Sequence, residues 1–375
     1  MKTPKIVIIG AGPAGGACAL VLARLGIAEV LVLDKATYPR IKVCGSGLSP
    51  HALEMLDLLG LRQRFASSHV GMPRLLARGP EGEEVRLAGR EGAWVVPRVD
   101  LDAAVIGEAV RSGAVFREGA KVVELLRDDA GEVTGVRTDD GTIEADLVVC
   151  ANGSPSRFST DASPATGIRT IMGWWSDTAL RSDEAVMIWD RRLEGYYAWA
   201  FPEPRGRMNI GLTIPEHAAA ADALKQLFQE LLDEHFGAAL ASAEPHGKWM
   251  GHPATVTTRI GELAQSHAMW IGEAARLVSP GTVEGISFAL ESGMVAAEFI
   301  AEHFDATHGF SRVQRALLRT KMIARMLPKF WAGAAFARLM RSDPARHLTA
   351  QVLDPQWFAS KATRLVGDRT TRGAT

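Results

Sequence analysis

The sequence predicts an α/β fold, α+β over the whole chain, and three observations lead to this prediction. The apolar run Lys5–Ile9 leads straight into a glycine-rich turn and then a helical pattern, which is typical of a buried parallel strand and its crossover helix. Residues 168–215 are rich in β-branched and aromatic residues, which indicates a second, antiparallel sheet. Residues 301–375 form a separate, helical C-terminal region in this prediction.

Composition narrows the class of protein. The 375 residues are 47% apolar and 23% charged, as in a globular enzyme with an ample core. A formal net charge of −1 argues against a nucleic-acid binder. The sequence contains no run of about 18 apolar residues that could span a membrane. The glycine-rich turn stands where a signal peptide would have its apolar core, which argues against a signal peptide. The cysteines, Cys18, Cys44 and Cys150, suit neither a disulfide framework nor a zinc site. We therefore predict a cytoplasmic, reduced protein without a bound metal.

The first thirty-five residues carry the clearest functional signal. After the strand comes the GxGxxG spacing, then a helix that ends near Gly26, then a second strand, Val30–Leu33, closed by an acid. The glycines permit a tight turn, backbone approach to a pyrophosphate and close helix packing, and the acid can bind a ribose diol. The helix N-terminus offers free N–H groups to phosphate. The sequence therefore predicts a dinucleotide site at Gly10, Gly12, Pro13, Ala14, Gly15, Asp34 and Lys35.

Three later segments complete a cofactor site by resemblance. The strand Leu147–Cys150 with its turn at Asn152–Ser154, the segment Met269–Pro280 before a helix, and Arg98 in Pro97–Asp102 are similar to the remaining flavin-contacting parts of the glutathione-reductase-like Rossmann FAD fold. They resemble in particular the para-hydroxybenzoate-hydroxylase-like flavoproteins. Glu273 and Asn152 stand where that family has Asp. The resemblance implies FAD contacts at Arg98, Gly153, Gly272, Glu273, Pro280, Gly285 and Ile286.

Two further motifs indicate a branch of this superfamily. Tyr38–Pro50, with Cys44 and Gly45, is similar to the Cys-Gly motif of geranylgeranyl-reductase-type flavoproteins, and Tyr197–Pro202 resembles their YxWxFP motif. Asn209 stands where that family has the first Gly of a GxG. The resemblance covers residues 1 to about 300 and adds Cys44 and Gly45 to the expected FAD contacts. No second GxGxxG is present, so NAD(P)H docking transiently or an external electron donor is expected to supply the electrons.

These anchors predict the domain organisation. Residues 1–75, 95–155 and 265–300 are expected to form one discontinuous FAD domain. Residues 76–94 and 156–264 are expected to form an inserted antiparallel-sheet substrate domain, and 301–375 the C-terminal helical region.

The predicted substrate side is apolar and aromatic. Tyr197, Trp199 and Phe201 alternate along a strand and therefore share one face, which would form a wall for a bulky apolar or aromatic substrate. With Cys44 they are the pocket candidates, and no catalytic residue is assigned. The alternative is an ordinary aromatic core. His51, His246 and His252 are candidate acids or bases, but isolated histidines are more often structural.

The motifs predict an FAD-dependent oxidoreductase and leave its reaction open. The aromatic wall and the breadth of the superfamily slightly favour a monooxygenase that hydroxylates through oxygen activated at flavin C4a. The alternative is geranylgeranyl-reductase-type reduction of isoprenoid double bonds. A halogenase is less favoured because Trp199–Pro202 departs from Trp-x-Trp-x-Ile-Pro. A non-catalytic flavin-binding module is the remaining alternative.

Residues 312–346 are strongly basic. Leu318, Met322 and Met326 repeat every four residues, which predicts an amphipathic helix. A docked helix with a solvated basic face is the favoured interpretation. The alternative is transient contact with a membrane surface or with an acidic carrier protein that presents a small-molecule or lipid-like substrate. The protein would then be peripheral to a membrane.

Overall fold

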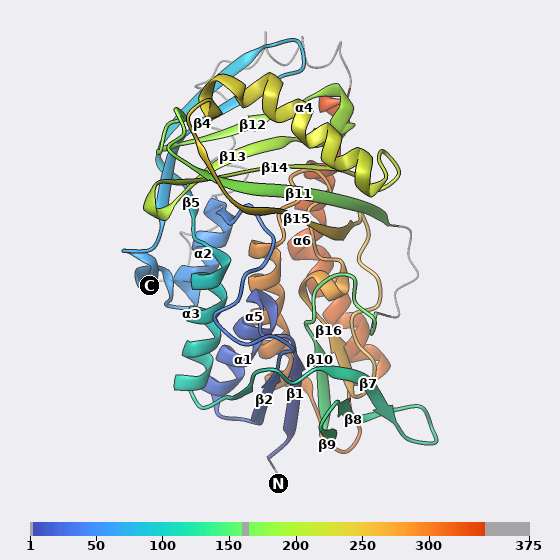
Figure 1. The fold of residues 1–375 in the computed structure, drawn as a ribbon. Coiled ribbons are helices and arrows are strands. Elements are labelled where there is room, and N and C mark those ends of the chain that lie inside the picture. Colours follow the sequence, from blue (N-terminus) through green and yellow to red (C-terminus); the bar gives the residue numbers. More distant parts are fainter. Residues whose placement is uncertain (1–2, 160–164, 342–375) are drawn as a thin grey trace, which may run out of the picture.

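A computed structural model describes residues 3–159 and 165–341 (Figure 1). Its lower half is a parallel sheet of five strands in the order β16-β10-β1-β2-β6. Every neighbouring pair in it is parallel. This confirms the predicted α/β class. The strands are β1 (Lys5–Ile9), β2 (Glu29–Leu33), β6 (Val115–Arg117), β10 (Leu147–Cys150) and β16 (Ala268–Trp270).

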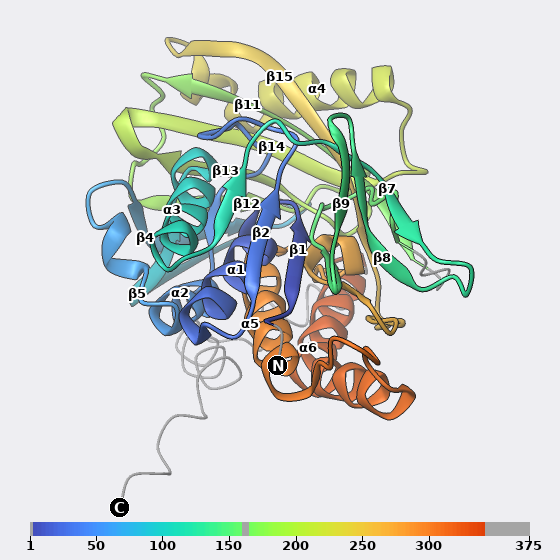
Figure 2. The ribbon, with the colours of Figure 1, turned by 90° about the horizontal axis from the view of Figure 1, so that it is seen from below.

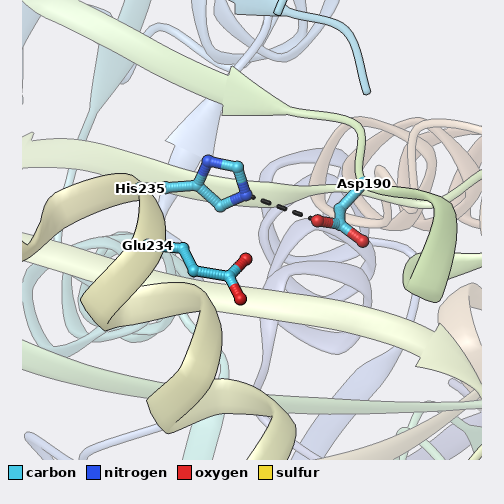
Figure 3. A group of neighbouring side chains, drawn as sticks. All are labelled: Asp190, Glu234 and His235. Atoms are coloured by element: carbon cyan, nitrogen blue, oxygen red, sulfur yellow. Dashed lines mark hydrogen bonds and ion pairs between the residues drawn. The ribbon is translucent and has the colours of Figure 1, made fainter. Parts of the chain in front are cut away.

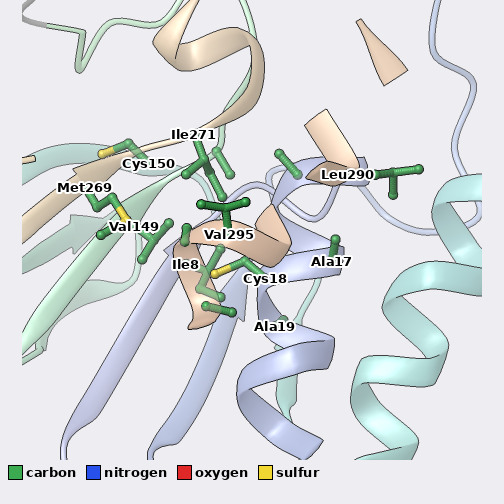
Figure 4. Close-up of a cluster of buried hydrophobic side chains, with 14 of the residues drawn as sticks. Ile8, Ala17, Cys18, Ala19, Val149, Cys150, Met269, Ile271, Leu290 and Val295 are labelled. Atoms are coloured by element: carbon green, nitrogen blue, oxygen red, sulfur yellow. The ribbon is translucent and has the colours of Figure 1, made fainter. Parts of the chain in front are cut away.

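Helices pack closely on this sheet because small residues line their contacts. The helices are α1 (Pro13–Leu25), α2 (Pro50–Leu58), α3 (Arg98–Arg111) and α5 (Ile286–His303). A Cβ at Gly293 of α5 would stand 2.3 Å from the carbonyl oxygen of Ala14, and one at Gly16 would stand 2.8 Å from Val105 Cγ1 of α3. Figure 4 shows the core that results, in which Cys18 packs with Ile8 and Val295.

The upper half is a curled sheet of eight strands, which α4 (Ala221–Leu240) crosses on its outer side (Figure 1). Its order is β15-β11-β14-β13-β12-β4-β5-β3. The prediction of a wholly antiparallel sheet needs one correction, because β12 pairs with β4 in parallel. These two strands come from distant parts of the chain, so no hairpin forces them antiparallel. The strands are β3 (Gly47–Leu48), β4 (Val70–Arg78), β5 (Glu84–Val95), β11 (Thr166–Ser176), β12 (Glu184–Ile188), β13 (Ala198–Glu203), β14 (Arg207–Pro215) and β15 (Glu244–Val256).

The domain boundaries stay a prediction, and the chain crosses between the two sheets more than once. Strand β4 spans the predicted boundary at residue 75, and β3 reaches the large sheet from within the first predicted segment. A small three-stranded sheet of β7 (Val122–Arg127), β8 (Val133–Thr138) and β9 (Gly141–Glu144) extends from the lower half (Figure 2). Short 3₁₀ turns lie at Arg62–Phe65 (η1), Arg191–Leu193 (η2), Pro204–Gly206 (η3) and Gly272–Ala275 (η4).

The last described helix is α6 (Arg312–Met340). A capping box at Ser311 and Gln314 starts it, and Leu318, Met322 and Met326 are buried as their spacing predicts. Residues 342–375 of the predicted C-terminal region lie outside the described residues. No helix in the described part of the chain is both long and apolar enough to cross a bilayer.

Candidate functional site

The glycine-rich turn contains three glycines with different surroundings. A Cβ at Gly15 would stand 1.9 Å from the carbonyl oxygen of Gly10, and Gly10 itself has a φ of +100°. The fold therefore requires glycine at both Gly10 and Gly15. A Cβ at Gly12 would meet only the guanidinium tips of Arg40 and Arg98, at 3.6 and 3.9 Å among the described atoms. Gly12 is also the N-cap of α1 without a side-chain cap, so the open space faces free N–H groups. This geometry fits a diphosphate.

Two guanidinium groups border this space. Arg98, at the start of α3, is 9% exposed and donates from Nε and Nη2 to Asp102 at 2.8 and 2.7 Å. Arg40 Nη2 lies 3.0 Å from the same carboxylate, which is 1% exposed. Burial opposes the charge of Arg98, but Asp102 raises its pKa, so the group stays cationic. The pair is therefore oriented and charged for an anionic ligand.

Asp34 closes β2 and holds the next loop in place. Its Oδ2 accepts from the Ala11 N–H at 2.9 Å and from the Tyr38 hydroxyl at 3.1 Å, while Oδ1 accepts from the Ala36 N–H at 2.9 Å. Arg40 Nε in turn donates to the Tyr38 oxygen at 3.0 Å. A carboxylate has further acceptor capacity, so Asp34 can still bind a ribose hydroxyl. Lys35 is exposed beside it.

The turn after β10 and the 3₁₀ turn after β16 meet at Glu273. A Cβ at Gly153 would lie 3.8 Å from Glu273 Oε2, and the backbone of Ser154 hydrogen-bonds to this carboxyl. Gly272, with φ of +58°, brings the turn against Ala14 of α1. Burial raises the pKa of Glu273, and the nearby Lys42 and Arg98 oppose this shift in part. The structure thus gathers Gly153, Gly272 and Glu273 near the glycine-rich turn.

Lys42 and His252 form a contact that the sequence analysis did not assign. Lys42 Nζ lies 2.6 Å from His252 Nε2, which joins the loop after β2 to β15 of the large sheet. Burial and then Lys42 lower the pKa of His252 to about 4, so the imidazole is neutral and accepts from the ammonium group. Burial also lowers the pKa of Lys42, and Glu273 opposes that shift. Lys42 stands two residues before Cys44 in the Tyr38–Pro50 motif, so its place near the candidate site could have been predicted from the sequence. His252 was a candidate acid or base in the sequence, but its contact with Lys42 was not predicted.

Tyr197, Trp199 and Phe201 form an aromatic wall. Their ring centroids are 6.3 Å apart at each step, and Trp189 continues the row at 5.7 Å from Tyr197. The Cys44–Gly47 segment packs directly on this wall: a Cβ at Gly45 would be 3.0 Å from Trp199 Nε1. The structure therefore brings the two family-like motifs together, although they are far apart in the chain.

Asn209 fixes the central ring of the wall. It is fully buried, and its Oδ1 accepts from Trp199 Nε1 at 2.7 Å. Gly211 on the same strand lets the indole lie flat, because a Cβ there would be 2.4 Å from Trp199 Cζ2. The residue that departs from the family pattern is thus the hydrogen-bond partner of Trp199. The replacement of Gly by Asn209 was visible in the sequence, but its role in holding Trp199 was not.

The loop before α5 closes the site from the other side. The Tyr197 hydroxyl donates to the carbonyl oxygen of Thr282, and Ser49 bonds to Glu284. Gly285 is the N-cap of α5 without a side-chain cap, so the first N–H groups of this helix, from Ile286 on, are free, and Pro280 is buried in the preceding loop. Arg98, which borders the space at Gly12, also hydrogen-bonds to Cys44 and so links the Cys44–Gly47 segment to the glycine-rich turn. All four cofactor segments and the wall therefore converge.

Other candidate residues lie elsewhere. His51 is buried against Glu291 at 3.2 Å, and His246 is exposed on β15. Figure 3 shows Asp190, Glu234 and His235, whose possible ligand atoms lie within 4.8 Å of one another. Arg192 already donates to Asp190 at 2.8 and 2.7 Å and bonds to Glu234. Although burial opposes it, these hydrogen bonds lower the pKa of Asp190. The trio is thus part of an ion-pair network around a guanidinium.

This geometry agrees with the comparison with protein families. Residues 3–312 match the model of the FAD binding domain. The chain belongs to this family and is an FAD-dependent oxidoreductase.

Two relatives identify a narrower group within this family. The chain is 31% identical over 322 residues to a menaquinone reductase of Mycolicibacterium smegmatis, covering 79% of this chain and 76% of that protein. It is 30% identical over 311 residues to digeranylgeranylglycerophospholipid reductase 2 of Methanopyrus kandleri, with 79% and 76% covered. These relatives confirm the resemblance to the geranylgeranyl-reductase group.

Solved structures support the fold. A geranylgeranyl bacteriochlorophyll reductase-like protein of Thermoplasma acidophilum superposes with a TM-score of 0.79 at 19% identity, over 98% of this chain and 92% of that one. The flavin-dependent brominase Bmp2 gives 0.74 at 20% identity, over 98% and 100%. At these identities the likeness concerns the fold alone.

Proposed function

We propose that the protein reduces a carbon–carbon double bond in the isoprenoid chain of a lipid-like substrate. The observation that carries this proposal is the convergence of the Cys44–Gly47 segment, the aromatic wall and the Thr282 loop around one place. Relatives that share about a third of the sequence are reductases of menaquinone and of a digeranylgeranyl lipid, and both compounds carry isoprenoid chains. These relatives favour reduction over hydroxylation, the reaction that the sequence alone slightly favoured.

The residues divide the work of such a reduction. Reduced FAD supplies a hydride when bound. The free N–H groups at Gly12, the Arg40–Arg98 pair and Asp34 would hold the adenosine diphosphate part. Glu273 and the start of α5 would hold the remainder. The aromatic wall would align an apolar chain and exclude water from the reacting bond.

After the hydride has reached one carbon, a single proton must reach the other carbon of the double bond. We propose Tyr197 as the donor because, among the wall residues Tyr197, Trp199 and Phe201, it is the one with a hydroxyl group, which donates to the Thr282 carbonyl oxygen. Burial raises its pKa, so the phenol stays protonated. The Cys44 thiol lies close to it and is the second candidate. The oxidised cofactor then has to be reduced by NAD(P)H, docking transiently, or by an external donor. The absence of a second GxGxxG in the sequence is what supports this part of the proposal.

An anaerobic turnover experiment tests the reaction. Protein reduced with dithionite is mixed with a geranylgeranyl-bearing lipid that contains no quinone ring, because reduction of a quinone would also add two hydrogen atoms. The flavin spectrum and the product mass are followed. We expect reoxidation of the flavin without oxygen and a product heavier by two hydrogen atoms. Tyr197→Phe should slow this step without loss of bound FAD, and Cys44→Ser tests the alternative donor.

Repeating the experiment in air separates the other reactions. A product heavier by one oxygen atom, formed only in air, would assign a monooxygenase. A halogenated product formed in air with bromide or chloride would assign a halogenase. Flavin binding without any turnover of these substrates would leave a flavin-binding module and contradict the proposal.

A further inference from the structure

The outward side of α6 carries a row of exposed apolar residues, which Thr320 and Lys321 interrupt. Val313 is 78% exposed, Leu317 47% and Trp331 58%. Ala324, Pro328 and Ala335 are exposed on the same row. The steps between these residues are three, four or seven positions, which places the row on one side of the helix, opposite the buried Leu318, Met322, Met326 and Phe330. We call this row the outer face of α6.

All charged side chains of this helix are basic. From Arg312 to Met340 the sequence contains no acidic residue. Arg325 and Lys329 approach the buried carboxylate of Glu291 at 3.6 Å each, yet their side chains stay 47% and 43% exposed. Arg315 approaches Glu262 at 3.9 Å, and Arg319 donates to the carbonyl oxygens of Ile260 and Gly261. The indole N–H of Trp331 donates to the Thr258 carbonyl oxygen at 3.2 Å, while 58% of this residue stays exposed. The basic residues of α6 are Arg312, Arg315, Arg319, Lys321, Arg325, Lys329 and Arg338.

The same helix covers the candidate site. A Cβ at Gly281 would stand 1.8 Å from the carbonyl oxygen of Gly333, so α6 lies directly on the loop that Tyr197 contacts. Phe336 also packs on Trp189 with ring centroids 5.6 Å apart. Figures 1 and 2 show α6 at the periphery of the molecule, beside α5. The thickness of the helix (about 10 Å) and the Gly281 loop therefore separate the outer face from the aromatic wall.

We propose that the outer face of α6 docks on the surface of an anionic lipid bilayer. Exposed Trp and aliphatic side chains beside several Lys and Arg are the chemistry of an interfacial helix, since the apolar groups enter the acyl boundary and the cations meet lipid phosphates. Such a row is costly to leave in water. The idea that docking presents a lipid substrate to the aromatic wall rests on the proposed function. The docking itself does not.

Vesicle sedimentation with the FAD-loaded full chain tests the docking. We expect binding to vesicles of phosphatidylcholine with phosphatidylglycerol, little binding to phosphatidylcholine alone, and loss of binding at high salt. Lys321→Gln with Arg338→Gln should weaken binding about fivefold for each charge removed. Val313→Gln with Leu317→Gln should weaken it at least about tenfold.

Matched controls remove the same groups elsewhere. Leu25→Gln with Val115→Gln changes side chains that are 48% and 56% exposed on α1 and β6. Arg137→Gln with Arg181→Gln removes two exposed charges from other elements. Both controls should bind as the wild type does. Flavin content and melting temperature verify that every variant is folded.

Each outcome decides the proposal. Failure of the wild type to bind anionic vesicles, or equal weakening by the α6 variants and the controls, overturns it. Binding to polyglutamate but not to vesicles assigns the face to an acidic protein and also overturns it. Turnover of a detergent-dispersed substrate is measured in parallel, and the α6 variants should retain it. Vesicle binding without turnover would contradict only the proposed function.

Discussion

At the scale of single residues, Gly12 and Gly15 show how one motif serves both the fold and the ligand. They stand three positions apart, yet a Cβ at Gly15 would collide with the backbone of Gly10, whereas a Cβ at Gly12 would enter open space before two guanidinium tips. A side chain at Gly12 would therefore block the ligand rather than the fold.

Gly12→Val should abolish retention of FAD and leave the melting temperature of the cofactor-free protein nearly unchanged. Gly15→Ala should instead lower the free energy of unfolding by at least about 3 kcal/mol, because a backbone atom cannot move aside as a side chain can. The ratio of flavin to protein absorbance and denaturant melts of both variants check this. Normal flavin content in Gly12→Val would contradict the placement of the diphosphate.

Asn209 provides a second prediction about a single side chain. Asn209→Leu leaves the indole N–H of the buried Trp199 without its acceptor, so the free energy of unfolding should fall by about 1–3 kcal/mol. Adding Trp199→Phe removes the orphaned donor and should recover much of this loss. Urea melts of the single and double variants form the cycle. Additive losses would show that the hydrogen bond is not what Asn209 contributes.

The sequence predicted the residues of the glycine-rich turn and of the wall because each belongs to a pattern with a fixed spacing. Asn209 and His252 could not be found that way. Asn209 interacts across two strands, and His252 meets Lys42 only because β15 lies at the edge of the sheet. Such contacts depend on register, which spacing along one chain does not encode.

At the scale of elements, the loop after β2 is tied to β15 by a neutral imidazole. His252 has an ordinary pKa of 6.5 that the fold lowers to about 4. Between these values the unfolded chain binds the additional proton, so stability rises with pH, is complete above about 6.5 and is lost as pH falls toward 4.

The wild type should therefore lose stability relative to His252→Gln as the pH falls from about 6.5 to about 4. The glutamine keeps an acceptor for Lys42 but does not titrate. Denaturant melts of the two proteins across this range measure the difference. Curves that stay parallel would show that His252 is not held neutral in the folded state.

The contact between α6 and the Gly281 loop leads to a further prediction. Gly281→Ala places a methyl group 1.8 Å from the Gly333 carbonyl oxygen, so the loop and the helix must separate. We expect a loss of at least about 3 kcal/mol of unfolding free energy and faster hydrogen exchange in both segments. Gly237→Ala is the matched control. No described atom lies within 4 Å of its added Cβ on α4, so it should stabilise the protein by about 0.5–1 kcal/mol. Unchanged exchange in Gly281→Ala would contradict the contact.

Elements with their own periodicity were predictable. The opening strand, helix and second strand lie where the sequence placed them, and α6 buries the residues that repeat every four positions. The parallel pairing of β4 with β12 was not predictable, because strand order in a curled sheet depends on packing between distant segments. The outer face of α6 was also hidden, since its apolar residues lie on the side opposite the expected stripe.

At the scale of the whole molecule, the ligand should contribute to stability because its expected contacts come from four separate segments. Free FAD at a hundred times its dissociation constant should raise the free energy of unfolding by about 2.7 kcal/mol. FMN lacks the adenosine and one phosphate expected at Asp34 and Gly12, so it should stabilise much less. Melting temperatures of the cofactor-free protein with each flavin check this. Equal stabilisation would contradict binding of the adenosine half at that end.

The interleaving of the two sheets limits how this architecture can change. Because β3, β4 and β5 reach the substrate sheet before α3 returns the chain to the parallel sheet, no contiguous cassette holds the wall together with all of its supports. A chimera that exchanges residues 166–256 with a relative would import β12 with its neighbour β13 but leave behind β4, its other pairing strand. New substrate ranges should therefore arise through point changes on β13, β14 and the Cys44–Gly47 segment, and protein engineers should begin there.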